Sequence, residues 1–91
     1  MSDDLQARFE LASKQVTELS EAPDNLAKLK LYALFKQSSV GDATGSRPGM
    51  MDFVNRAKYD AWAELKGRTQ DEAKNDYIAF VEELKAADAK K

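Results

Sequence analysis

The chain has 91 residues, a formal net charge of −2 and neither cysteine nor histidine. This length fits one domain, residues 1–91, and the composition excludes a disulfide framework, the usual zinc ligands and the commonest acid–base group at neutral pH. A pI near 5.1 argues against nucleic-acid binding, which needs a basic surface. No signal-like or membrane-spanning apolar run occurs, so we expect a cytoplasmic protein without membrane insertion, cofactor or metal.

The first predicted helix covers residues 3–20. Its apolar residues recur at spacings of four and three, which form one stripe of an amphipathic helix: Leu5, Phe9, Ala12, Val16 and Leu19. The segment SEAPDN at residues 20–25 ends this helix, because Pro23 cannot continue it and Asp24 and Asn25 favour caps and turns.

A second helix is predicted to follow and to run to about Gln37. Its apolar residues cover more than one stripe: Leu26, Ala27, Leu29, Leu31, Tyr32, Ala33, Leu34 and Phe35. A helix that is apolar on two faces either lies deep in the fold or presents one face to a ligand or partner.

Residues 38–51 are predicted to form a long loop. The segment SVGDATGSRPGM within it holds three of the four glycines and one of the two prolines. At ~3.3 Å per residue the loop reaches about 46 Å, whereas a helix of about 15 residues measures about 22 Å. The loop can therefore cross the full length of a bundle, which leaves the second and third helices parallel.

Two further helices complete the prediction. The third runs from Asp52 or Phe53 to Lys66, with Gly67 as its C-terminal glycine, and Thr69 with Glu72 forms a capping box before the fourth. The fourth helix carries a mixed apolar face: Ala73, Tyr77, Ile78, Phe80, Val81 and Leu84. We expect an all-α four-helix bundle of up-down-down-up topology, in which helices one and two, and three and four, form antiparallel hairpins.

Short segments around the long loop form a specific pattern: Tyr32-x-x-x-Lys36-Gln37, Val40-Gly41-Asp42, Arg47-Pro48-Gly49-Met50, Asp52-Phe53, Ala57-Lys58-Tyr59-Asp60-Ala61-Trp62 and Glu64-Leu65-Lys66-Gly67. In register from Phe9 to about Lys85, this pattern resembles the acyl-CoA-binding protein family, also called the diazepam-binding inhibitor family. The resemblance implies a four-helix fold with parallel second and third helices. It also implies non-catalytic binding, buffering and intracellular transport of medium- to long-chain fatty acyl-CoA esters.

The resemblance further implies a set of binding residues. Tyr32 and Lys36 match residues that face the 3′-phosphate of the coenzyme, and Lys58 on the third helix meets the same phosphate. Tyr77 matches a tyrosine that contacts the adenosine portion. The remaining candidate positions are Leu29 in the acyl groove, Met50 and Phe53 at the loop and helix start, Lys28 beside the acyl channel, and Ser13 at a position where a small residue permits close approach.

The chemistry of these residues agrees with that role. Tyr32 and Lys36 are four apart on a helix and point the same way. A phosphomonoester carries about −2 charges, and lysines from two helices can converge on it. Taken singly, Lys36 and Lys58 are more often surface residues, and Tyr77 lies within an apolar stripe, where core packing is the simpler interpretation.

Three positions depart from the family pattern. Tyr59 replaces a tryptophan, so we expect weaker ligand contact there. Lys28 stands where an apolar residue is usual, although its methylene stem can still cover an acyl chain. Thr17 replaces a lysine near the adenine end, so we expect lower affinity for the nucleotide.

Two other classes of function stay open on the residues alone. One is a helical protein-interaction module whose wide apolar second helix docks a partner helix. The other is an enzyme that acts on acyl-CoA esters. We expect instead a monomeric, non-catalytic binding protein for long-chain acyl-CoA, with transient contacts to acyl-CoA-using enzymes or membranes.

Overall fold

The computed structural model describes residues 2–90, with side chains described from residue 4 onward. Within this range the chain forms helices and no strands: α1 (Ser2–Gln15), the short 3₁₀ helix η1 (Val16–Glu18), α2 (Asn25–Ser39), α3 (Phe53–Ala63) and α4 (Gln70–Ala89). The all-α fold class is thus confirmed. None of the described helices is long and apolar enough to cross a membrane.

The first helix is shorter than predicted. α1 ends at Gln15, and η1 follows before Leu19 adopts extended backbone at φ −63° and ψ 144°. The Thr17 hydroxyl closes this turn by donating a hydrogen bond of 2.7 Å to the Lys14 carbonyl. β-Branched residues are stiff in a helix, and 3₁₀ turns are common at helix ends. The predicted end at residue 20 was therefore wrong, although the apolar spacing continues past the α-helix.

Side-chain caps mark the starts of α2 and α4. The Asp24 carboxylate accepts a hydrogen bond of 2.8 Å from the Ala27 N–H. Thr69 and Glu72 form the predicted capping box: the Glu72 N–H donates to Thr69 Oγ1 at 3.0 Å, and the Thr69 N–H donates to Glu72 Oε1 at 2.9 Å. These bonds satisfy backbone donors that the start of a helix leaves free.

The third helix ends at Ala63 rather than at the predicted Lys66. The chain continues in tighter turns, in which the Leu65 N–H donates to the Trp62 carbonyl at 3.0 Å and the Lys66 N–H donates to the Ala63 carbonyl at 3.2 Å. Gly67 follows with a φ of 94°, a conformation that residues with a side chain rarely adopt. Gly67 thus ends this region as predicted, with 3₁₀-type turns in place of the last α-helical turn.

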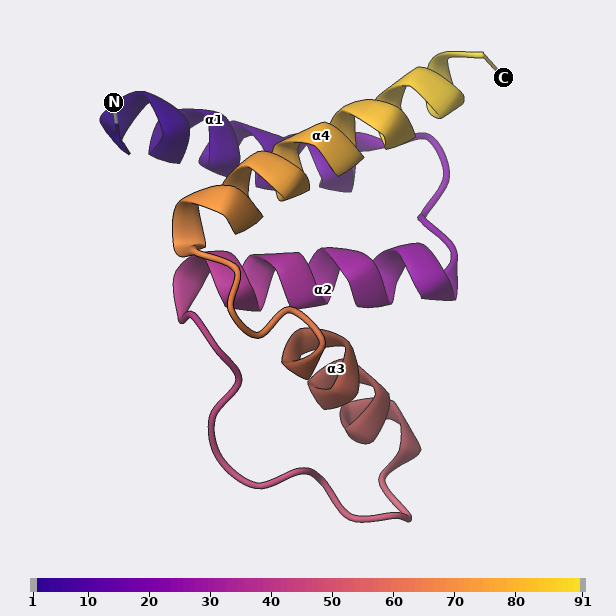
Figure 1. The fold of residues 1–91 in the computed structure, drawn as a ribbon. Coiled ribbons are helices and arrows are strands. Elements are labelled where there is room, and N and C mark those ends of the chain that lie inside the picture. The colour runs from indigo at the N-terminus through magenta and orange to yellow at the C-terminus, as the bar shows by residue number, and fades with distance from the viewer. Residues whose placement is uncertain (1, 91) are drawn as a thin grey trace.

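The helices are arranged up-down-down-up, as predicted. Figure 1 shows α2 and α3 running in one direction, and α1 and α4 in the opposite direction. α4 packs against both α1 and α2, and α3 packs against α2. Within the described residues, no Cα atoms of α1 and α2 approach within 8 Å, nor do those of α3 and α4. Each predicted hairpin thus has antiparallel helices whose backbones do not approach closely, and α1 meets α2 only through side chains such as Phe9 and Phe35. Complementary apolar stripes, not short connections, decide which helices pack most closely.

The core lies between α1, α2 and α4. Its buried residues form one cluster: Phe9, Ala12, Leu34, Tyr77 and Val81. The ring centroids of Phe9 and Tyr77 are 5.0 Å apart in an edge-on pair, and Phe35 stacks on Phe9 at 5.5 Å. Because these buried residues come from three of the four helices, the seam between α2 and α3 is a separate surface.

α2 extends to Ser39 rather than to the predicted Gln37. The crossover loop joins its end to the start of α3, and side chains of α3 bond to the loop at three points. The Trp62 Nε1–H donates to the Gly41 carbonyl at 2.8 Å. The Tyr59 hydroxyl donates to the Gly45 carbonyl at 3.1 Å. Arg47 donates two hydrogen bonds, of 2.8 and 2.7 Å, to the Asp60 carboxylate. The loop therefore lies along α3, as Figure 1 shows, and returns the chain to the other end of the seam.

A buried glutamine connects the end of α2 to two other segments. Gln37 has no exposed surface, and its Nε2 donates to Asp42 Oδ1 at 2.9 Å and to the Arg68 carbonyl at 2.8 Å. The same Asp42 oxygen accepts a hydrogen bond of 3.0 Å from the Gly67 N–H. These two bonds, the one from Gly67 first, lower the pKa of Asp42. They join the loop start and the α3–α4 connection to α2.

Candidate functional site

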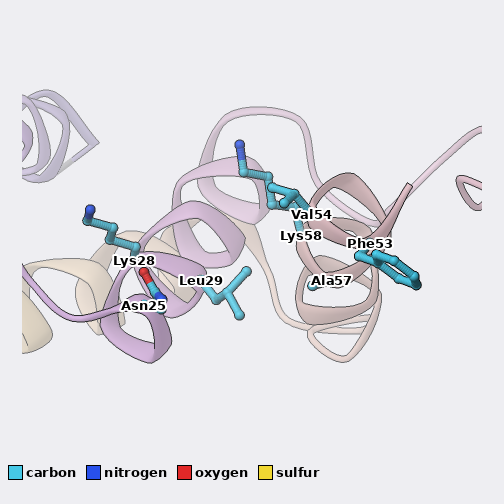
Figure 2. Close-up of a pocket in the computed structure, with 7 residues that line it drawn as sticks. All are labelled: Asn25, Lys28, Leu29, Phe53, Val54, Ala57 and Lys58. Atoms are coloured by element: carbon cyan, nitrogen blue, oxygen red, sulfur yellow. The ribbon is translucent and has the colours of Figure 1, made fainter. Parts of the chain in front are cut away.

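A groove of about 390 Å³ lies between α2 and α3. Its lining residues come from both helices: Asn25, Lys28, Leu29, Phe53, Val54, Ala57 and Lys58. Figure 2 shows Leu29 reaching from α2 toward Ala57 on α3, with the two lysine ammonium groups at the ends of extended side chains. The groove thus combines an apolar floor with cations at its edge, which suits a ligand that has an apolar part and an anionic part.

A second groove, of about 560 Å³, lies along the same pair of helices. Leu29 and Ala57 line both grooves, so these two side chains lie at the boundary between them. The second groove has mostly aliphatic residues and a few charged ones in its lining: Leu26, Lys30, Ala33, Leu34, Asp60, Ala61, Glu64 and Leu65. The seam therefore offers more apolar surface than the first groove alone.

Two lysines and two aromatic rings meet across the seam beside the first groove. The Lys58 Nζ of α3 lies 5.3 Å from the centre of the Tyr32 ring of α2. The Lys36 Nζ of α2 lies 4.9 Å from the centre of the Trp62 ring of α3. Cations are attracted to ring faces at such distances. The structure therefore brings the predicted residues Tyr32, Lys36 and Lys58 to one seam.

Tyr77 lies in the core, on α4. Only 4% of its surface is exposed, and its ring packs against Phe9 and, with centroids 6.2 Å apart, against Phe35. Burial raises the pKa of the Tyr77 phenol. Most of the Tyr77 side chain therefore packs in the core, and only a small part of it can contact a ligand.

The apolar residues predicted at the loop and helix start are largely exposed. Phe53 is 72% exposed and lines the first groove, whereas Met50 is 75% exposed and is not part of the groove lining. Val54, next to Phe53, is 67% exposed. This end of the seam is an apolar surface that an apolar ligand could cover.

Known proteins match the chain over most of its length. The family model described as acyl CoA binding protein matches residues 6–81. The chain belongs to the acyl-CoA-binding protein family. The acyl-CoA-binding protein homolog 1 of Caenorhabditis elegans is 50% identical over 76 residues, which cover 84% of this chain and 88% of that protein. The acyl-CoA-binding protein of Brassica napus is 45% identical over 85 residues, which cover 93% of this chain and 92% of that one.

Solved structures agree with this assignment. The crystal structure of Oryza sativa Acyl-CoA-Binding Protein 2 superposes with a TM-score of 0.92 at 38% identity, covering 97% of this chain and 96% of that one. The acyl-CoA-binding protein of Moniliophthora perniciosa superposes with a TM-score of 0.85 at 34% identity, covering 91% and 82%. The acyl-CoA-binding protein family is one of binding proteins rather than enzymes.

In this member of the acyl-CoA-binding protein family, Tyr59 contacts the loop. Its hydroxyl bonds to the Gly45 carbonyl, and its ring meets the Trp62 ring edge-on with centroids 6.3 Å apart. Tyr59 thus helps to hold the crossover loop on α3. Weaker ligand contact at this position stays a prediction.

Two polar residues on the first helical segment use their hydroxyls locally. Ser13 is half-buried and donates a hydrogen bond of 2.8 Å to the Glu10 carbonyl, and Thr17 is exposed and bonds to Lys14. The Ser13 hydroxyl is therefore occupied by a bond within α1. Thr17 adds no cation, and the lower nucleotide affinity that we expect from it also stays a prediction.

Sequence reasoning missed several residues that line the groove. Asn25 precedes Leu29 by four on α2, and Val54 precedes Lys58 by four on α3. Residues four apart share a helix face, so extending the predicted faces by one turn would have found both. The contact of Trp62 with Lys36 depends on how α2 and α3 align, and nothing local in the sequence indicates it.

Proposed function

We propose that the protein binds medium- to long-chain fatty acyl-CoA esters without converting them, and that it buffers and transports them as a cytoplasmic monomer. The observation that carries the proposal is the α2–α3 groove, which is lined by apolar side chains and by Lys28 and Lys58. Lys36 lies at the same seam, over the Trp62 ring of α3. Membership of the acyl-CoA-binding protein family supports the class of ligand. Long-chain acyl-CoA has the matching two-part chemistry, an apolar tail and a phosphorylated head.

The 3′-phosphate end of the ligand is assigned to Tyr32, Lys36 and Lys58. The phosphate carries about −2 charges at neutral pH, and the lysines approach it from two helices. Each charge-assisted hydrogen bond contributes about 1.5–3 kcal/mol. The three side chains are half-buried, so salt should weaken this part of binding only in part.

The acyl chain is assigned to the groove floor around Leu29, Ala57 and Phe53, with the Lys28 stem along one side. Each methylene group removed from water contributes about 0.8 kcal/mol, and ten would contribute about 8 kcal/mol before the costs of association. The chain would cover exposed apolar surface at Phe53, and Met50 would border it at the loop end. Burial of the tail should therefore dominate the affinity.

The adenosine end is assigned to the exposed part of Tyr77 and to the space beside Ser13. A base that stacks on a ring needs an accessible ring face, and Tyr77 offers little surface of any kind. We therefore assign Tyr77 a contact through the edge of its ring or its hydroxyl, with the ring face packed in the core. Ser13 is small enough to permit close approach.

Calorimetric titration with saturated acyl-CoAs of increasing length tests the proposal, with free CoA and free fatty acid as controls. Affinity should rise with each methylene, by at most about fourfold, until the groove is full. The recovered ligand should keep its thioester, whereas an enzyme of acyl-CoA metabolism would cleave or alter it. Equal affinity for short and long acyl-CoAs would show that the groove does not hold the chain.

A second candidate function, a helical protein-interaction module, draws support from the exposed apolar surface. Leu26 is 79% exposed and Met51 is 87% exposed, near the starts of α2 and α3. A partner helix could dock on such a surface. Native mass spectrometry of freshly purified protein separates the two: copurified acyl-CoA supports the carrier, and a stable protein partner without ligand supports the module.

A further inference from the structure

We infer that Trp62 is a positioning residue for phosphate recognition, because its ring holds the Lys36 ammonium group at the seam where Lys58 also lies. The inference rests on the function proposed above and deepens it. It assigns to a buried tryptophan, which has almost no surface for the ligand, a specific effect on recognition of the 3′-phosphate.

The geometry is reciprocal. Tyr32 and Lys36 are four residues apart on α2, and Lys58 and Trp62 are four residues apart on α3. Each lysine lies over the ring that the other helix provides, at 5.3 Å for Lys58 and 4.9 Å for Lys36. Because α2 and α3 run in the same direction (Figure 1), the Tyr32–Lys58 and Lys36–Trp62 pairs lie on successive helical turns of one seam. Both ammonium groups are thereby kept at the seam.

The Trp62 ring is itself fixed. It is 7% exposed, its Nε1–H donates to the Gly41 carbonyl at 2.8 Å, and the Tyr59 ring packs edge-on against it. A lysine that lies on a fixed ring samples fewer rotamers than a free surface lysine. Lys36 therefore loses less conformational freedom when a phosphate binds, which is the general advantage of preorganisation.

Because the two rings are neutral, they leave the lysine charges available to a phosphate. Among the residues that the structure describes, neither Lys36 nor Lys58 has a carboxylate oxygen within 4.0 Å. A carboxylate partner would hold a lysine equally well but would cancel its charge and repel the phosphate. A ring face attracts the cation and leaves the full positive charge available to an anion.

The test compares Kd for CoA and for 3′-dephospho-CoA in wild type and in variants. The Kd for 3′-dephospho-CoA divided by the Kd for CoA measures recognition of the 3′-phosphate alone. A loss of affinity that affects both ligands equally cancels in this ratio. In Trp62→Leu, which lacks the ring, we expect the ratio to fall by about threefold to tenfold. Trp62→Phe keeps a ring face but lacks the N–H donor, and it should retain most of the ratio.

Phe80→Leu is the matched control. The Lys30 Nζ lies 4.4 Å from the centre of the Phe80 ring, so this variant also removes the ring from a lysine–ring pair, at a half-buried position of α4 outside the proposed site. We expect it to lower stability without changing the ratio. An unchanged ratio in Trp62→Leu, or an equal fall in Trp62→Phe and Trp62→Leu, would overturn the inference.

A measurement on the wild type covers the case in which Trp62→Leu does not fold. The indole ring should shift the proton resonances of the Lys36 side chain upfield, and unshifted resonances would overturn the inference. Failure of the proposed function looks different. In that case wild type itself binds CoA and 3′-dephospho-CoA equally, or binds neither, before any variant is compared.

Discussion

Substitution of Tyr77 should separate its part in the core from its part in binding. The side chain is 4% exposed and packs against Phe9 and Phe35 at the centre of the α1–α2–α4 cluster. Tyr77→Ala removes the ring, whereas Tyr77→Phe removes only the hydroxyl. We expect Tyr77→Ala to destabilise the fold strongly and Tyr77→Phe to leave it nearly unchanged.

The magnitude follows from burial. Truncating a buried aromatic residue to alanine costs about 3–5 kcal/mol, through lost burial and the cavity that remains. The free energy of unfolding of a domain is only about 5–15 kcal/mol, so this variant should lose a large fraction of it. Tyr77→Phe keeps both ring pairs and should change stability by less than about 1.5 kcal/mol. Any loss of ligand affinity in Tyr77→Phe can then be attributed to the hydroxyl.

Urea unfolding followed by far-ultraviolet circular dichroism measures these differences. Phe53→Ala is the matched control, since it truncates an aromatic residue that is 72% exposed, and its stability should change little. A loss of less than about 1 kcal/mol in Tyr77→Ala would show that this ring does not anchor the core.

Alkaline pH provides a second test of the same burial. Burial raises the pKa of the Tyr77 phenol, so the folded state disfavours its ionised form. The resulting stability is present below the unfolded pKa of about 10 and is lost as the pH rises through the folded pKa. Tyr77→Phe has no phenol at this position to ionise, so it should lose less stability than wild type above about pH 10. Identical alkaline profiles would contradict the burial argument.

Three further predictions concern the seam and the loop. Lys58→Met should weaken palmitoyl-CoA binding by about tenfold or more in calorimetry with little change in melting temperature, and an equal loss for the 3′-dephospho ligand would count against the phosphate contact. Hydrogen bonds from Gly67 and Gln37 lower the pKa of Asp42, so its stability contribution is present above the unfolded pKa of about 3.9 and is lost as the pH falls through the folded value. Asp42→Asn should therefore lose less stability than wild type in acid unfolding below about pH 4, and parallel curves would contradict this. Arg47→Ala removes the two hydrogen bonds to Asp60. Hydrogen-exchange mass spectrometry should then show faster exchange of loop amides, while the free energy of global unfolding changes little. Unchanged loop exchange would show that these bonds do not hold the loop.

The sequence by itself determined the local structure of the protein. Apolar spacing predicted the helices, and the capping box at Thr69 located the start of α4, because these signals depend on neighbours three or four residues apart. The α-helical ends of α1 and α3 fall earlier than the apolar spacing predicted. The length of the loop predicted the parallel arrangement of α2 and α3. The pattern of motifs also indicated the family and, within it, the group of Tyr32, Lys36 and Lys58.

Only the tertiary structure decided which helices pack together and which neighbours each side chain has. Several apolar stripes of similar character could pair in more than one way, and the choice of α4 as the partner of both α1 and α2 depends on how all of them are buried at once. That choice places Tyr77 in the core. The alignment of α2 with α3 likewise brings Lys36 to Trp62, two residues 26 positions apart whose contact no local spacing predicts.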